Sequence, residues 1–166
     1  MSDAVDSAVV TPSGGTSIII TRELQASRER VWEAFHDPNL VSQWWGPVGR
    51  TNHITEIDLR PGGRWRFGQK APDGSEVIYG GEYVEIDAPR KFVYTKHWAN
   101  MPDDEQASNT NKDSVITAIF EEEGGKTTVT LACEFASSFI RDQALESGME
   151  RMQRSYDRMD TLLASD

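Results

Sequence analysis

The feature that most constrains the fold is the C-terminal segment 138–163, which predicts one long amphipathic helix. Its apolar residues recur at steps of three and four, the spacing that places side chains in one stripe along a helix. The stripe consists of Leu145, Met149, Met152, Tyr156, Met159 and Leu163. Methionine fills irregular space, and Gly148 in mid-helix leaves room for a close neighbour or a ligand. The stripe therefore fits either a plain core or a partly open cavity beneath the helix.

The start of the chain carries the patterns of a strand followed by two short helices. Residues 16–24 contain three consecutive isoleucines and predict a strand. Ser27 is a suitable N-cap for a helix over 28–35. A second short helix follows, with Asp37 as its N-cap and proline at its first position, and ends at Trp45 before a Gly-Pro pair.

Six further strands are predicted before the long helix, because short runs that favour β-structure alternate with turn residues. They cover residues 51–59, 64–69, 76–86, 91–98, 114–121 and 126–135. The polar segment 100–113 predicts a loop. Gly80 and Gly81 interrupt one strand, where a bulge would bend the sheet and change which neighbouring side chains point inward.

This order of elements predicts an α+β fold. A strongly curved antiparallel sheet of about six to seven strands would wrap around the long helix, with the two short helices closing one end. We expect one domain over 16–166, preceded by a flexible tail over 1–15. The tail has neither the basic nor the apolar region of a signal peptide, and it is too polar to span a membrane.

Charge and cysteine count exclude several classes of function. The 166 residues carry a formal net charge of -10, which repels nucleic-acid phosphates, so no nucleic-acid partner is expected. Cys133 is the single cysteine of the sequence, which rules out an intramolecular disulfide and indicates a cytoplasmic protein. The histidines His36, His53 and His97 lack metal-ligand spacing, and the glycine pairs do not precede a helix, so we expect neither a metal nor a cofactor.

The aromatic residues are the most informative for function. Most of them fall in the half of the chain expected to face the long helix, where they can fill a core or line an apolar cavity. A cavity between a bent sheet and a single helix would suit a small hydrophobic molecule. The residues expected to line it are Trp44, Trp45, Trp65, Phe67, Tyr79, Tyr83, Phe92, Tyr94, Met149, Met152 and Tyr156.

No catalytic template is recognisable, so the catalytic residues are unknown from the sequence. His97 and Glu82 are candidates for proton transfer, provided that His97 lies inside the cavity with Tyr79, Tyr83 or Glu82. His97 is out of step with Tyr94 along its strand, which places it on the other face unless a bulge intervenes.

Several short motifs are distinctive. They are Asp37-Pro38, Trp44-Trp45-Gly46-Pro47, Arg60-Pro61-Gly62-Gly63 with Trp65 and Phe67, Asp73-Gly74, Gly81-Glu82-Tyr83 ahead of Pro89, and Gly148-Met149 to Tyr156-Asp157-Arg158. Together they resemble the heat-shock-protein ATPase activator homologue family of the START-like (SRPBCC) superfamily, over nearly the whole chain. The resemblance implies a helix-grip fold with a deep hydrophobic cavity. The superfamily includes lipid carriers, hormone receptors, polyketide cyclases and subunits that support chaperones, and the resemblance supplies no catalytic residues.

Three functions fit these observations. The first is binding of a small hydrophobic or aromatic molecule between the sheet and the C-terminal helix. The second is a cyclase-like or aromatase-like enzyme that uses the same cavity. The third is an interaction domain that associates with a chaperone or with a second copy as a homodimer. A chaperone is the least expected partner, because the eukaryotic activator has a separate N-terminal domain for which residues 1–15 leave no room.

Overall fold

The computed structural model describes residues 15–45, 51–98, 114–135 and 137–164. Within these ranges the elements are β1 (Ser17–Leu24), α2 (Arg28–His36), α3 (Pro38–Trp44), β2 (Thr51–Ile57), β3 (Arg64–Lys70), β4 (Glu76–Asp87), β5 (Lys91–Trp98), β6 (Ser114–Glu123), β7 (Lys126–Glu134) and α5 (Ser138–Ala164). This order confirms the predicted α+β succession. The predicted loop over 100–113 lies outside the described residues, as does the predicted tail apart from its last residue.

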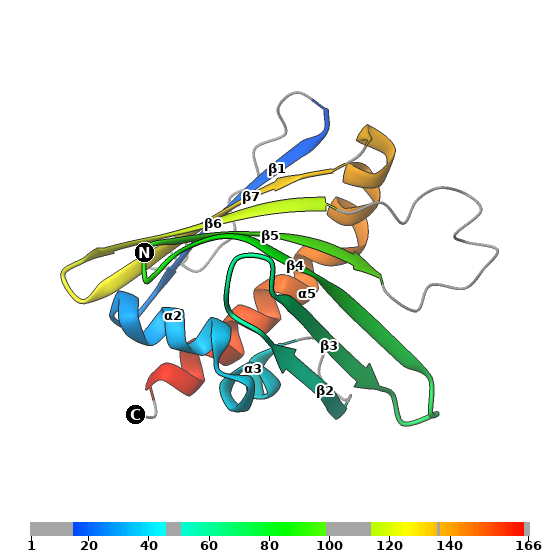
Figure 1. Cartoon of the computed structure of the whole chain (residues 1–166), viewed down its shortest axis with the longest axis horizontal. Coiled ribbons are helices and arrows are strands. Elements are labelled where there is room, and N and C mark those ends of the chain that lie inside the picture. The colour runs from blue at the N-terminus through cyan, green and yellow to red at the C-terminus, as the bar shows by residue number, and fades with distance from the viewer. Residues whose placement is uncertain (1–14, 46–50, 99–113, 136, 165–166) are drawn as a thin grey trace.

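The strands form one seven-stranded antiparallel sheet in the order β1-β7-β6-β5-β4-β3-β2. The sheet is strongly curved, α5 lies along its concave side, and α2 and α3 lie at one end (Figure 1). Both short helices contact α5 as well. We call the side of the sheet toward α5 the inner face and the other side the outer face. The arrangement confirms the predicted helix-grip fold.

The corner between α2 and α3 is fixed by Asp37. Its backbone N–H donates to the Glu33 carbonyl and ends α2. Its carboxylate accepts a hydrogen bond from the Asn39 N–H at 2.9 Å and begins α3. Ser27 caps the start of α2 in the same way, since its hydroxyl accepts from the Arg30 N–H. These caps satisfy N–H groups that have no partner within a helix, so two short helices can form at the end of the sheet.

The C-terminal half of α5 packs its predicted apolar stripe against the rest of the chain. Met159 and Leu163 are buried, and burying a side chain of this size contributes about 1.5–3 kcal/mol. Arg22 on β1 adds a buried charge at this interface, with its Nη2 2.8 Å from Asp157 Oδ1 and 3.2 Å from Asp160 Oδ2. The stripe and the ion pairs together fix which side of α5 faces the sheet.

Strands β3, β4 and β5 are joined by a tryptophan in addition to strand pairing. The indole of Trp65 on β3 lies over Gly81 of β4, and its N–H donates to the Thr95 carbonyl of β5 at 3.0 Å. The Thr95 hydroxyl accepts from the Glu82 N–H at 3.0 Å. A Cβ at Gly81 would lie 1.8 Å from the Thr95 carbonyl oxygen. Glycine is therefore required at this junction.

The bulge that we expected at Gly80 and Gly81 lies farther along β4. Pairing with β3 runs in register through both glycines, and pairing with β5 shifts between Tyr83 and Glu85. Gly81 pairs with the buried Trp65 and so lies on the inner face, which places Gly80 on the outer face. The predicted position was wrong because Gly81 allows the close approach of an indole and does not interrupt the pairing with β3.

Replacing Gly81 with alanine should destabilise the fold by at least about 2 kcal/mol, because the added methyl group collides with the Thr95 carbonyl. The matched control is Gly80→Ala, whose methyl group would lie 3.1 Å from the Trp65 carbonyl oxygen and requires only a small shift. Urea unfolding followed by tryptophan fluorescence measures both variants. Equal losses of unfolding free energy in the two variants would contradict this role of Gly81.

The end of the fold beneath α2 is packed with aromatic rings around a buried histidine, His36. Its ring centroid lies 4.4 Å from those of Trp32 and Phe92. Its Nδ1 lies 2.9 Å from the Trp32 carbonyl oxygen, so this nitrogen carries the proton, since a carbonyl only accepts. Burial lowers the pKa of His36 to about 4, and the imidazole is neutral at pH 7. His36 is therefore a core residue of this end of the fold, which we call the closed end.

This burial predicts a loss of stability in mild acid. The unfolded chain protonates His36 near pH 6.5 and the folded chain only near pH 4, so the unfolded state binds more protons between these values. The contribution is fully present above pH 6.5, and about 3 kcal/mol is lost as the pH falls to 4. Urea unfolding at several pH values should show a smaller dependence in His36→Phe.

The control for this measurement is His53→Asn, at an exposed position of β2. His53 lies outside the core, where its ring contacts Glu76, and replacing it leaves the imidazole of His36 buried. The loss of unfolding free energy assigned to His36 should therefore persist in this variant. An unchanged dependence in His36→Phe would show that His36 is not the group responsible.

Candidate functional site

The inner face of β3, β4 and β5 carries a group of aromatic rings. We call this group, together with the C-cap tryptophan of α3, the inner wall: Trp45, Trp65, Phe67, Tyr79 and Tyr94. The Phe67 ring lies 5.2 Å from Trp45 and 4.9 Å from Trp65. Tyr79 lies 5.9 Å from Trp45, and Tyr94 lies 5.8 Å from Trp65. The structure therefore brings five of the predicted binding residues into one continuous surface.

Part of the inner wall remains accessible. Trp65 and Phe67 are buried, whereas Trp45, Tyr79 and Tyr94 keep exposed surface. Trp45 is held in place through its backbone, because its carbonyl oxygen accepts from the side-chain amides of Asn52 and Gln69. Its ring lies against Phe67 and Tyr79 and keeps part of its surface exposed.

The interior also contains polar groups that stay protonated at neutral pH, one of them in the inner wall itself. Burial raises the pKa of the Tyr94 phenol well above its usual value, and the phenol of Tyr156 and the thiol of Cys133 raise it further. Burial also raises the pKa of Cys133 to about 11 and shifts that of Tyr156 upward. At neutral pH these groups are uncharged, and a phenol in this state can donate a hydrogen bond.

Lys96 also lies on the inner face and was not among the predicted site residues. It follows the alternation of Tyr94 along β5 and pairs with the buried Ser114 of β6. Its Nζ lies 4.9 Å from the centre of the Tyr79 ring, a cation–π distance. Burial lowers the pKa of Lys96, an effect that Cys133 opposes. The signal was present in the sequence, because a lysine occupies an inward position between two aromatic ones on the strand.

Four predicted binding residues lie at the closed end instead. They are Trp44, Tyr83, Phe92 and Tyr156. Trp44 donates from its indole N–H to the Ala34 carbonyl at 2.8 Å and stacks on Tyr156 with a centroid separation of 5.9 Å. All four are buried and fill the core around α2 and α3. The side chains of the remaining two, Met149 and Met152, lie outside the described part of the structure.

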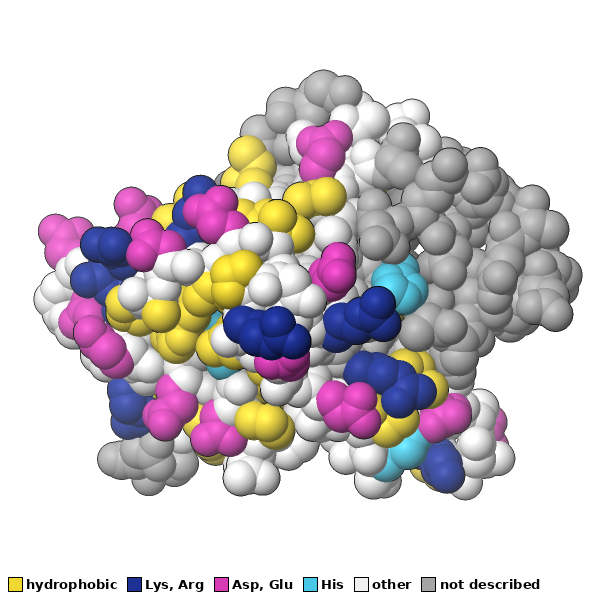
Figure 2. Space-filling view, in the orientation of Figure 1, with side chains coloured by type: hydrophobic (Ala, Val, Ile, Leu, Met, Phe, Trp, Pro, Cys, Tyr) yellow, Lys and Arg dark blue, Asp and Glu magenta, His cyan; other side chains and the backbone are white. Residues whose placement is uncertain are grey.

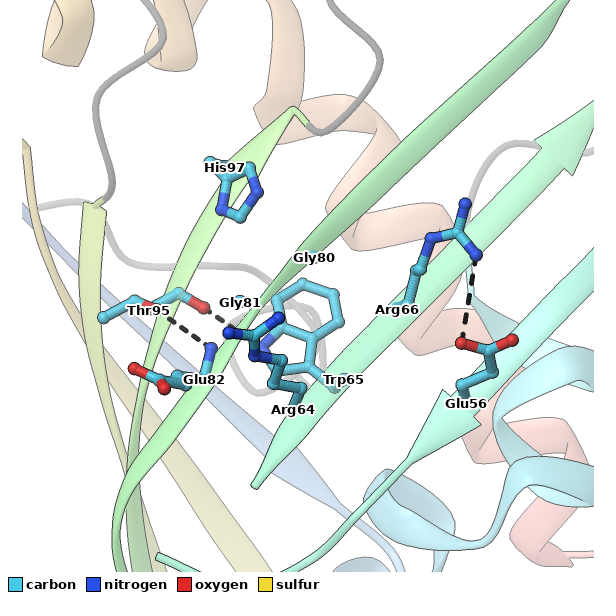
Figure 3. Close-up of a pocket in the computed structure, with 9 residues that line it drawn as sticks. All are labelled: Glu56, Arg64, Trp65, Arg66, Gly80, Gly81, Glu82, Thr95 and His97. Carbon is cyan, nitrogen blue, oxygen red and sulfur yellow. Dashed lines mark hydrogen bonds and ion pairs between the residues drawn. The ribbon is translucent and has the colours of Figure 1, made fainter. Parts of the chain in front are cut away.

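A separate depression of about 550 Å³ opens around the glycine pair of β4. It is lined by Glu56, Arg64, Trp65, Arg66, Gly80, Gly81, Glu82, Thr95 and His97. Its charged side chains stand on the outer face, with α5 behind the strands (Figure 3). Figure 2 shows basic and acidic side chains intermixed on this side of the molecule. An open, charged depression of this kind does not suit an apolar molecule.

The two candidates for proton transfer, His97 and Glu82, line this outer depression. His97 pairs with Gly80 across β4 and β5, and Glu82 pairs with Arg64 of β3. Tyr79 and Tyr83, in contrast, lie on the inner face. Strand alternation therefore separates His97 from both tyrosines with which we expected it to act, and leaves only Glu82 beside the same depression.

The residues that the structure describes contain no cluster of three or more His, Cys, Asp or Glu side chains placed to hold a metal ion. None of the helices in the described ranges is both long and apolar enough to cross a membrane.

Several solved structures share this fold over nearly their whole length. A protein from Rhodobacter sphaeroides matches with a TM-score of 0.85 at 20% identity, covering 96% of this chain and 100% of its own. Protein Ms6760 from Mycobacterium smegmatis has a TM-score of 0.80 at 26% identity, with coverages of 94% and 96%. The AHSA1 protein from Silicibacter pomeroyi has a TM-score of 0.70 at 21% identity, with coverages of 89% and 97%.

Comparison at the level of sequence identifies the family. No curated protein matches the chain. A family model does match, over residues 25–164, a range that includes both short helices, β2 to β7 and α5. This match agrees with the resemblance found in the motifs around Trp44 and Trp65. The chain belongs to the family of Activator of Hsp90 ATPase homolog 1-like proteins.

Proposed function

We propose that the protein binds a small hydrophobic or aromatic molecule between the inner wall and α5. One observation carries the proposal: the rings of the inner wall form a connected aromatic surface on the side of the sheet toward α5, and Trp45, Tyr79 and Tyr94 keep part of that surface exposed. An apolar molecule placed there would remove this surface from water.

Binding is better supported than catalytic turnover. The phenols of Tyr94 and Tyr156 and the thiol of Cys133 have raised pKa values, so none of them is a base near neutral pH. Lys96 has a lowered pKa, but none of the hydrogen bonds among the described residues joins its ammonium group to an acid. His97 lies on the outer face. The described part of the interior therefore offers contact surface and hydrogen-bond donors without an acid–base pair.

Association with another protein is also less well supported. Large hydrophobic side chains that are exposed within the described ranges are Ile19, Leu59, Val84, Val115 and Ile119. Ile19, Val115 and Ile119 lie on the outer face of β1 and β6, the two neighbours of β7, while Val84 lies on β4 and Leu59 in the turn before β3. A homodimer or a chaperone complex would leave the concave aromatic surface unexplained, whereas a small ligand accounts for it.

The proposed binding unit is the domain over 16–166, and we propose a cytoplasmic location for it. Cys133 is a free, buried thiol. Burial and a raised pKa make this thiol unreactive, which agrees with a structural cysteine in a reducing compartment.

The neutral probe N-phenyl-1-naphthylamine should bind the protein and raise its melting temperature. A ligand at one hundred times its Kd stabilises the folded state by about 2.7 kcal/mol. Tyr79→Ala removes part of the inner wall and should weaken probe binding about tenfold. Val84→Ala, at an exposed position of the same strand, should leave binding unchanged. Fluorescence titration gives the Kd, and circular dichroism gives the melting temperature.

Two results would contradict this proposal. One is the absence of any stabilisation of the wild-type protein by the probe. The other is equal weakening of binding in Tyr79→Ala and Val84→Ala, which would show that the probe does not distinguish the inner wall from an exposed strand position.

A further inference from the structure

Lys96 projects a positive charge into an interior that is otherwise aromatic. Strand alternation places it inward together with Tyr94, and its pairing partner on β6 is the buried Ser114. The ammonium group lies 4.9 Å from the centre of the Tyr79 ring. Lys96 and Cys133 of β7 are close enough for each to shift the pKa of the other. The side chain therefore points toward the space between the sheet and α5.

A positive charge in this position destabilises the folded protein unless an anion or another polar group interacts with it. Desolvation disfavours the charged form, which is the cause of the lowered pKa of Lys96. The face of the Tyr79 ring compensates only part of this cost, because a cation–π contact is weaker than an ion pair with a carboxylate. A hydrocarbon side chain at this position would have no desolvation cost. The presence of lysine instead suggests that an anionic group binds to its ammonium.

Other cations near α5 are compensated by the protein itself. Arg22 is buried and paired with Asp157 and Asp160. Arg158 donates to the Trp44 carbonyl at 2.9 Å and to the Ser155 hydroxyl at 3.2 Å. None of the ion pairs between described residues includes Lys96. Among the described residues, the Lys96 ammonium thus differs from Arg22 in having no carboxylate partner, and from Arg158 in donating no hydrogen bond to another side chain or carbonyl.

We propose that Lys96 binds the acid group of the ligand, so that the molecule held against the inner wall is an apolar carboxylic acid or a similar monoanion. This inference rests on the proposed function and adds the chemical class of the ligand. The ammonium would pair with the acid group, while the hydrocarbon or aromatic body would lie against Tyr79 and Tyr94. The protonated Tyr94 phenol is a hydrogen-bond donor on the same face of β5.

The test compares two probes that differ only in an anionic group. N-Phenyl-1-naphthylamine is neutral, and 1-anilinonaphthalene-8-sulfonate is the same ring system with a sulfonate. Wild-type protein should bind the sulfonate about tenfold more tightly, the effect expected of one charge-assisted contact in a partly buried site. The net charge of -10 repels anions at long range, so such a preference must come from a local group. Dodecanoic acid should displace either probe about tenfold better than dodecanol.

Substitutions assign the preference to one residue. Lys96→Met keeps the length and apolar stem of the side chain and should abolish the preference for the sulfonate while retaining the neutral probe. Lys96→Arg should keep the preference. Lys91→Met is the matched control, because Lys91 lies on the same strand with its ammonium paired to Glu85, and it should behave as wild type. Circular dichroism confirms that each variant is folded.

The outcomes separate this inference from the one on which it rests. Equal affinity of the wild type for the two probes would overturn the role of Lys96 and leave the proposed function standing. A preference for the sulfonate that survives in Lys96→Met would do the same. Binding of neither probe would overturn the proposed function together with the acid ligand.

Discussion

The curved sheet must be held at a fixed bend around α5, and the interior depends on how that bend is secured. The indole N–H of Trp65 reaches over Gly81 to the Thr95 carbonyl and so ties β3 to β5 across β4. The same indole belongs to the inner wall, so one residue both joins the strands and lines the proposed site. On the opposite side, Arg22 holds α5 to β1 through two carboxylates. The surfaces that would enclose a ligand therefore lie on rigid elements, which favours defined geometry.

The interior has two halves with different chemistry. At the closed end, aromatic rings pack around His36. Burial lowers the pKa of this histidine, so it is neutral at pH 7. Beside the inner wall, Lys96 lies above an aromatic face, and its side chain remains partly exposed. His36 is held neutral among the rings, whereas Lys96 has no carboxylate partner among the described residues. For this reason we place the proposed site in the half near β4 and β5. We assign a role in stability to the half around His36.

The succession of elements could be predicted from the sequence because the residues that begin and end each element act locally. Asp37 serves as the C-cap of one helix and the N-cap of the next, and the two cap positions depend only on neighbouring residues. The bulge in β4 was misplaced, because a glycine needed for close packing has the same local sequence signal as a glycine at a bulge. Alternation along β5 also predicts that Lys96 faces inward with Tyr94, although the pattern of aromatic residues alone does not include it.

The division of the aromatic residues between core and inner wall could not be predicted in this way. Trp44 and Trp45 are adjacent in sequence, yet the first is buried against Tyr156 while the second lies across Phe67 and Tyr79. Which of two neighbouring rings is enclosed depends on where α2, α3 and α5 meet, and that is a property of tertiary packing.

The most direct measurement of the central claim is the set of intermolecular nuclear Overhauser effects between dodecanoic acid and the protein. The account predicts contacts from the alkyl chain to the rings of Tyr79 and Tyr94, with the carboxylate end nearest Lys96. Contacts to Arg66 and His97 on the outer face, with none to these tyrosines, would contradict it.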